Sequence, residues 1–74
     1  MSETDREGAM LAAEHFEREV ASTRQVIAQI EKRKDDPFDG DAHLLAHYRK
    51  NLEYFEVRAK GIRSLLEASA LAQA

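Results

Sequence analysis

The residues that could do chemistry in this chain are mainly histidines and aspartates. His43 and His47 stand four residues apart, so on a helix both imidazoles would lie on one face and could grip a transition metal. Two ligands are an incomplete set, because such metals take three or four protein ligands. His15 and Glu19 share the spacing, but the paired Glu-x-x-His motifs of a di-iron bundle are missing. We therefore expect no metal and no cofactor, with His43 and His47 as the remaining metal candidates.

The residue patterns of common catalytic sites are also missing from the sequence. There is no cysteine, no glycine-rich phosphate loop and no G-x-S-x-G motif. The absence of cysteine also excludes disulfides and thiolate metal sites. We therefore expect a protein that is not an enzyme.

Composition points to helices as the elements that position these residues. The chain has 74 residues and a formal charge of −3, from 11 Lys+Arg and 14 Asp+Glu. Strong helix formers predominate, with only 3 Gly and 1 Pro, which predicts an all-α fold. Of the apolar residues, 12 are alanines and only 20 are larger, which is a thin core for a lone domain.

Apolar runs in the sequence are only a few residues long, so we expect no membrane span. The acidic start MSETDREG lacks the basic segment of a signal peptide. Together these features predict a cytoplasmic protein.

Turn-forming residues gather at one place, residues 35–41, which divides the chain into a single helical hairpin spanning residues 1–74. A capping box at Thr4 to Glu7 predicts a first helix over about 5–34, and Asp39 or Asp41 is expected to cap a second helix over about 42–70. The lysines and arginine at 32–34 would complement the negative end of the first helix dipole. The turn residues are Asp36, Pro37, Phe38, Asp39, Gly40 and Asp41.

Each predicted helix carries an apolar or small residue at alternating steps of three and four, here called the seam. The first helix contributes Ala9, Ala13, Phe16, Val20, Thr23, Ile27 and Ile30. The second contributes Leu45, Tyr48, Leu52, Phe55, Ala59, Ile62 and Leu66. A strict 3.5-residue period of this length is typical of coiled coils, so the helices should pack antiparallel.

The register of this packing follows from folding the two seams together about the turn. Facing seam residues then have numbers that add up to about 75, so Phe16 meets Ala59 and large side chains face small ones. On one flank of the seam, facing residues add up to 80 and are opposite in charge. These predicted pairs are Glu31–Arg49, Arg24–Glu56 and Glu17–Arg63.

The other flank carries a second stripe of apolar and small residues, interrupted by Glu19, Asn51 and Arg58. The stripe consists of Ala12, Val26, Leu44, Tyr54, Gly61 and Leu65. Two helices cannot bury both the seam and this stripe, so we expect a C₂ dimer that forms a four-helix bundle. Gly61 supports a close approach there, because glycine in mid-helix costs about 1 kcal/mol relative to alanine. Another helical protein could cover the same surface instead.

An RNA-binding hairpin dimer is the alternative from another class. Basic residues lie near the turn, among them Arg33, Lys34, Arg49 and Lys50. The aspartates of the turn nearly cancel this patch, and Arg49 is already assigned to Glu31, which leaves little charge for phosphates. Nucleic acid is therefore disfavoured as a partner.

The acidic turn DPFDGDA on a long hairpin resembles the fingertip of transcription factors that insert a coiled coil into the secondary channel of RNA polymerase. That resemblance implies aspartates directed at a metal and modulation of the polymerase. The size and layout are also similar to the hairpin chaperones that hold needle subunits in type III secretion. Aspartates with proline and glycine also suit an ordinary helix–helix turn, which is the role we assign them. The expected function is therefore a protein–protein interaction module acting as adaptor, chaperone or regulator.

Overall fold

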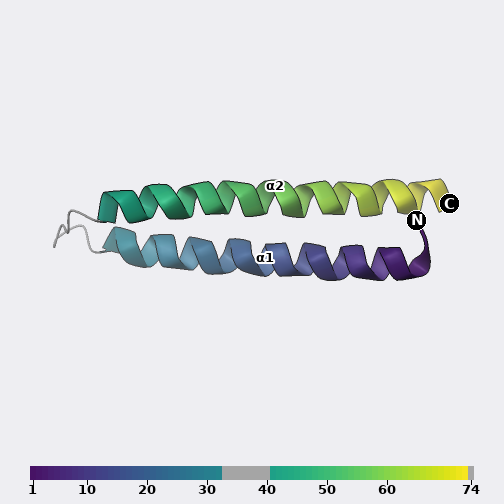
Figure 1. The fold of residues 1–74 in the computed structure, drawn as a ribbon, viewed down its shortest axis with the longest axis horizontal. Helices are drawn as coiled ribbons and strands as arrows, with labels where there is room; N and C mark the ends of the chain where they lie inside the picture. The colour runs from purple at the N-terminus through teal and green to yellow at the C-terminus, as the bar shows by residue number, and fades with distance from the viewer. Residues whose placement is uncertain (33–40, 74) are drawn as a thin grey trace.

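Two long helices lie side by side in the computed structural model, which describes residues 1–32 and 41–73. Helix α1 spans Glu3–Glu31 and helix α2 spans Asp41–Gln73. They run antiparallel, with both chain termini at the same end (Figure 1). The molecule measures 55 × 14 × 14 Å. The predicted all-α, two-helix hairpin is confirmed.

Helix α1 begins two residues earlier than predicted. Ser2 is its N-cap, with an extended backbone (φ −71°, ψ 163°), and its Oγ accepts a hydrogen bond from the Asp5 N–H at 3.2 Å. Ser2 and Asp5 have the spacing of a capping box two residues upstream of the predicted one, so the assignment of the cap to Thr4 was wrong. Glu3 and Asp5 add negative charge to the first turn, where the helix dipole favours it.

The other helix ends also differ from the prediction. Helix α1 ends at Glu31 rather than near Lys34, with Lys32 as its C-cap. Asp41 is the first residue of α2 rather than a cap before it, and α2 continues to Gln73 instead of ending near Ala70. Alanine has the highest helix propensity, which accounts for the longer C-terminal end. Of the predicted turn, Asp36, Pro37, Phe38, Asp39 and Gly40 lie outside the described residues.

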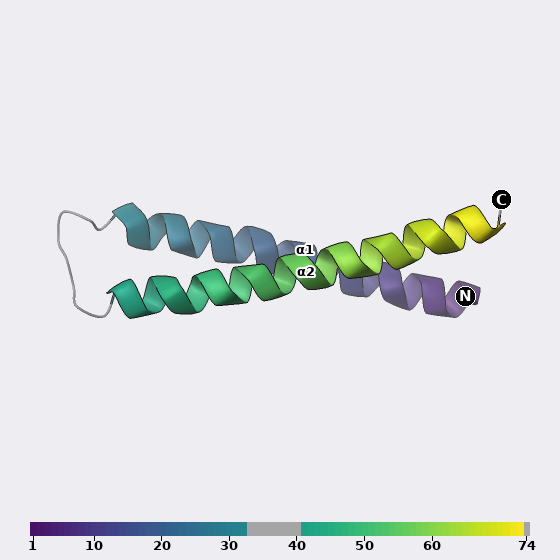
Figure 2. The same ribbon diagram turned by 90° about the horizontal axis from the view of Figure 1, so that it is seen from above.

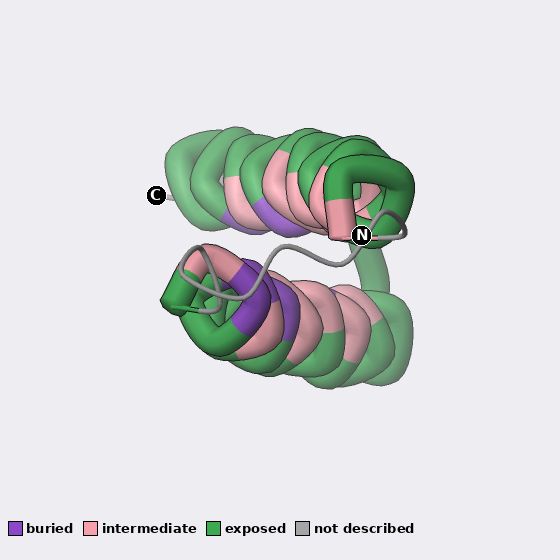
Figure 3. The backbone as a smooth tube through the Cα atoms, turned by 90° about the vertical axis from the view of Figure 1, so that its left-hand side faces the viewer, coloured by how far each residue is buried: buried purple, intermediate pink, exposed green. Residues whose placement is uncertain are grey.

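The seam forms the contact between the two helices. They cross at a shallow angle (Figure 2), and their buried residues face each other (Figure 3). Every seam position is buried or half-buried, and no other position in residues 1–32 and 41–72 is buried. The buried residues are Ala13, Thr23, Ile27, Ile30, Ala59 and Leu66.

The core that these residues form is thin. Ala13 is fully buried, but no large side chain in the described part of the chain is completely covered. Phe16, Leu52 and Phe55 are only half-buried, although they lie on the seam. Two helices shield each other along one side only, which explains the incomplete cover. Within the described residues, neither helix contains a segment long and apolar enough to cross a membrane.

Candidate interaction surface

Ion pairs line one flank of the seam and fix the register of the hairpin. Each joins an arginine and a glutamate whose numbers add up to 80, as the sequence predicts. The pairs are Arg24–Glu56 at 2.7 Å, Arg49–Glu31 at 3.3 Å and Arg63–Glu17 at 2.7 Å. These side chains are partly exposed, between 34% and 64%, so the pairs contribute more to the choice of register than to stability. This flank is therefore already occupied by contacts within one hairpin.

Arg63 and Glu17 form the tightest of these contacts. The Arg63 guanidinium donates two hydrogen bonds, from Nη2 to Oε1 at 2.7 Å and from Nε to Oε2 at 3.0 Å. These hydrogen bonds hold the pKa of Glu17 below its ordinary value, and Glu17 in turn raises the pKa of Arg63. Both shifts move titration away from neutral pH, so this pair holds structure rather than exchanging protons.

The opposite flank of the seam, here called the open face, consists of the second stripe with Glu19, Asn51 and Arg58. Ala12, Glu19, Val26 and Asn51 are half-buried there, and the remaining members are exposed. No ion pair among the described residues crosses this flank. The two flanks of the hairpin are thus unlike: one is closed by salt bridges and the other presents small and apolar side chains.

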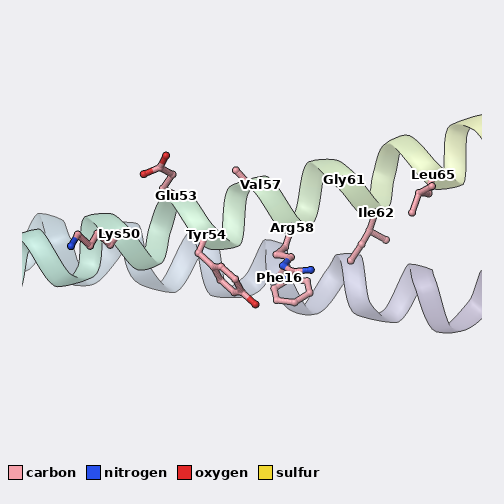
Figure 4. A pocket seen from close by; sticks show the side chains of 9 residues that line it. All are labelled: Phe16, Lys50, Glu53, Tyr54, Val57, Arg58, Gly61, Ile62 and Leu65. Carbon is pink, nitrogen blue, oxygen red and sulfur yellow. The ribbon is translucent and has the colours of Figure 1, made fainter.

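A groove of about 760 Å³ runs along the open face beside α2 (Figure 4). It is lined by Phe16, Lys50, Glu53, Tyr54, Val57, Arg58, Gly61, Ile62 and Leu65. Phe16 and Ile62 are seam residues, so the core reaches the surface at this point. Three further apolar side chains are largely exposed in it: Tyr54 at 51%, Val57 at 64% and Leu65 at 61%.

Aromatic contacts hold one wall of the groove in place. The Phe16 ring lies 6.5 Å from Tyr54 and 6.2 Å from Phe55, measured between ring centres. The Cζ atom of Arg58 lies 5.1 Å from the centre of the Tyr54 ring. Figure 4 shows Tyr54 and Arg58 leaning toward Phe16 on α1, whereas Glu53 and Val57 point away from it. The edge-on packing of Tyr54 against Phe16 and the cation–π contact of Arg58 therefore order this wall.

Gly61 leaves an opening in the lining of the groove. A Cβ atom built on Gly61 would have no neighbouring atom within 4 Å, and none of the described glycines has a positive φ. The hairpin therefore requires glycine here for neither space nor backbone conformation. A mid-helix glycine is unfavourable relative to alanine by about 1 kcal/mol, and a Cβ at this position would meet none of the described residues of the hairpin.

The candidate metal ligands His43 and His47 belong to no larger group of possible ligands among the described residues. His43 and His47 are exposed, and His47 Nε2 lies 3.3 Å from Asn51 Nδ2. The described residues contain no group of three or more histidine, aspartate or glutamate side chains arranged to hold a metal. Of the acidic turn, only Asp41 is described, half-buried in the first turn of α2.

The sequence pattern located most of this surface but missed part of the groove. It identified Tyr54, Gly61 and Leu65 as members of the second stripe. It missed Val57, which lies on the side of α2 turned furthest from the seam, where a search for positions beside the seam does not look. An isolated valine between charged residues was the available signal.

Comparisons of the chain with protein-family models, with curated proteins and with solved structures found no match. Among the described residues, the open face and its groove are the surface best suited to bind a partner.

Proposed function

We propose that the chain is a noncatalytic protein–protein interaction module that associates with itself through the open face to form a dimeric four-helix bundle. In that form it would serve as an adaptor, chaperone or regulator. The observation that supports this proposal is the groove, where Phe16 and Ile62 of the seam reach the surface beside exposed Tyr54 and Leu65.

Burial of apolar surface provides the driving force. Each square ångström of apolar surface removed from water is worth roughly 25 cal/mol, and the hairpin alone leaves its large seam residues incompletely covered. One long side of the molecule, 55 × 14 Å, has a projected area of about 770 Å². Stable interfaces of standard size bury about 600–1,000 Å² per partner, so one side is within the range that a dimer needs.

A second copy of this chain is the simplest occupant of the open face, because it requires no other protein. Both copies carry the same incomplete core, so one symmetric interface covers both at once. The small residues Ala12 and Gly61 let helices approach closely, as a bundle requires. A different helical protein is the competing occupant.

Sedimentation of the wild type and two matched variants tests the proposal. Leu65 on the open face is 61% exposed, and Leu71, on the same helix but outside the groove and the open face, is 78% exposed. We expect a wild-type dimer at tens of micromolar, a monomer for Leu65→Glu and a dimer for Leu71→Glu. Circular dichroism should show unchanged helix content in all three.

Two results would contradict the proposal. A wild-type chain that sediments as a monomer at tens of micromolar would remove the second copy and leave a different helical protein as the occupant. A dimer that survives Leu65→Glu as well as Leu71→Glu would place the interface elsewhere on the hairpin.

A further inference from the structure

Two opposite charges lie at the middle of the open face. Glu19 is near the midpoint of α1 and Arg58 is near the midpoint of α2. Glu19 is half-buried yet forms no ion pair with any described residue. Arg58 is exposed and contacts the ring of Tyr54. A dimer that covered this face without pairing the two charges would leave them desolvated, which opposes association.

Symmetry allows two arrangements of a dimer through this face. A two-fold axis along the hairpin places α2 of each copy against α1 of the other, so the hairpins point in the same direction. A two-fold axis across the hairpin places like helices together, so the hairpins point in opposite directions. The first arrangement brings Arg58 to Glu19 of the second copy, whereas the second brings Arg58 to Arg58 and Glu19 to Glu19.

We propose that the two hairpins of the dimer point in the same direction and are joined by reciprocal ion pairs between Arg58 of one copy and Glu19 of the other. This inference rests on the proposed self-association. An axis along the hairpin leaves each residue at its own height, so facing residues across the interface again have numbers near 75, the value predicted for the seam of one hairpin. Arg58 and Glu19 add up to 77 and therefore meet. Charges around the central layer of the four helices then alternate in sign.

Side-chain sizes fit the same arrangement. Residues whose numbers add up to 76 face each other beside the central charges, which places Gly61 opposite His15 and Tyr54 opposite Ser22 of the second copy. Each layer then combines a large side chain with a small one, as close packing requires. The open space over Gly61 is where the imidazole of His15 would lie.

Distances between spin labels test the direction of the hairpins. The chain has no cysteine, so Ala42→Cys places one label per copy near one end and Arg18→Cys places one near the middle. For Ala42→Cys we expect a separation of about 25 Å or less. Opposite directions would give about 45 Å, because Ala42 lies about 15 residues from the middle at 1.5 Å per residue.

The Arg18→Cys label separates failure of this inference from failure of the proposed dimer. Its separation is short in both arrangements, so a short distance there with a long one at Ala42→Cys would overturn the orientation alone. The absence of any intermolecular distance for both labels would show that no dimer forms.

Charge reversal tests the ion pairs. Glu19→Arg and Arg58→Glu should each raise the dimer dissociation constant at least tenfold, and the double variant should restore it to within about threefold of the wild type. In the opposite arrangement each single reversal exchanges one like-charge pair for another, so an unchanged constant would refute the pairing. If Arg58 paired with Glu19 of the same hairpin instead, each single reversal would lower the unfolding temperature and leave the dissociation constant unchanged. That result would also refute the proposed pairing between copies.

Discussion

Replacing Gly61 with alanine separates the needs of one hairpin from those of the proposed dimer. Within one hairpin the added Cβ has no neighbour within 4 Å, and the backbone of Gly61 is not in the positive-φ region. The gain in helix propensity is then unopposed and worth about 1 kcal/mol. For a domain of this size that gain raises the unfolding temperature by about 4–8 °C.

In the dimer the same methyl group should have the opposite effect. It would occupy space that the second copy fills with His15, and overpacking a close contact costs about 1–3 kcal/mol. The dimer dissociation constant should therefore rise about tenfold or more. Thermal unfolding in the Leu65→Glu background measures the first effect, and sedimentation of Gly61→Ala alone measures the second.

Gly8→Ala is the matched control, because Gly8 also lies inside a helix with no atom within 4 Å of a built Cβ. In the proposed dimer Gly8 faces Ala68, where one more methyl group meets only a small side chain. We expect Gly8→Ala to stabilise the hairpin similarly and to leave association unchanged. Equal behaviour of the two variants in sedimentation would refute the argument that Gly61 lies in an interface.

Two further predictions concern the hairpin itself. Leu66→Ala should lower the free energy of unfolding by about 3 kcal/mol because Leu66 is buried. Leu71→Ala, at an exposed position, should change it by less than about 0.5 kcal/mol. Urea unfolding measures both values, and similar losses for the two variants would show that the seam is not the core. The lowered pKa of Glu17 means that its bond to Arg63 stabilises the fold above the unfolded-state pKa of about 4.3, and that this contribution is lost as the pH falls through the folded-state value. The difference in unfolding temperature between wild type and Glu17→Gln should therefore be present at pH 7 and shrink progressively as the pH is lowered below about 4, and a difference that did not change with pH would rule out the ion pair as its source.

Much of the fold was predictable because the constraints on it are short-range. Once a 3.5-residue period fixes which side of each helix is buried, a short connection leaves few possible registers, and facing charges select among them. The first residue of α1 was harder to predict, because Ser2 and Thr4 can both cap a helix. The choice between them depends on whether Ser2 adopts an extended backbone. At its C-terminal end, α2 continues beyond the residue that the sequence pattern indicated, because alanine favours the helix there.

The groove was harder to predict from the sequence than the second stripe beside it. Phe16 and Ile62 were placed on the seam, but whether a seam residue is fully covered depends on how the two helices cross. That crossing depends on the packing of all the side chains together. Val57 contributes to the groove through its position relative to Tyr54 and Gly61 in space, which periodicity alone does not reveal.

The three ion pairs on the flank opposite the open face also disfavour a hairpin in which one helix is shifted along the other by one heptad. Glutamate, arginine and glutamate alternate along α1 at Glu17, Arg24 and Glu31, opposite arginine, glutamate and arginine on α2. A slip of seven residues in one direction would bring Glu17 to Glu56 and Arg24 to Arg49; in the other direction it would bring Arg24 to Arg63 and Glu31 to Glu56. Either slip loses all three attractions and creates two repulsions, while the seam residues would still meet other seam residues. The charge pattern on the two helices therefore disfavours both slipped registers, whatever the length of the connecting segment.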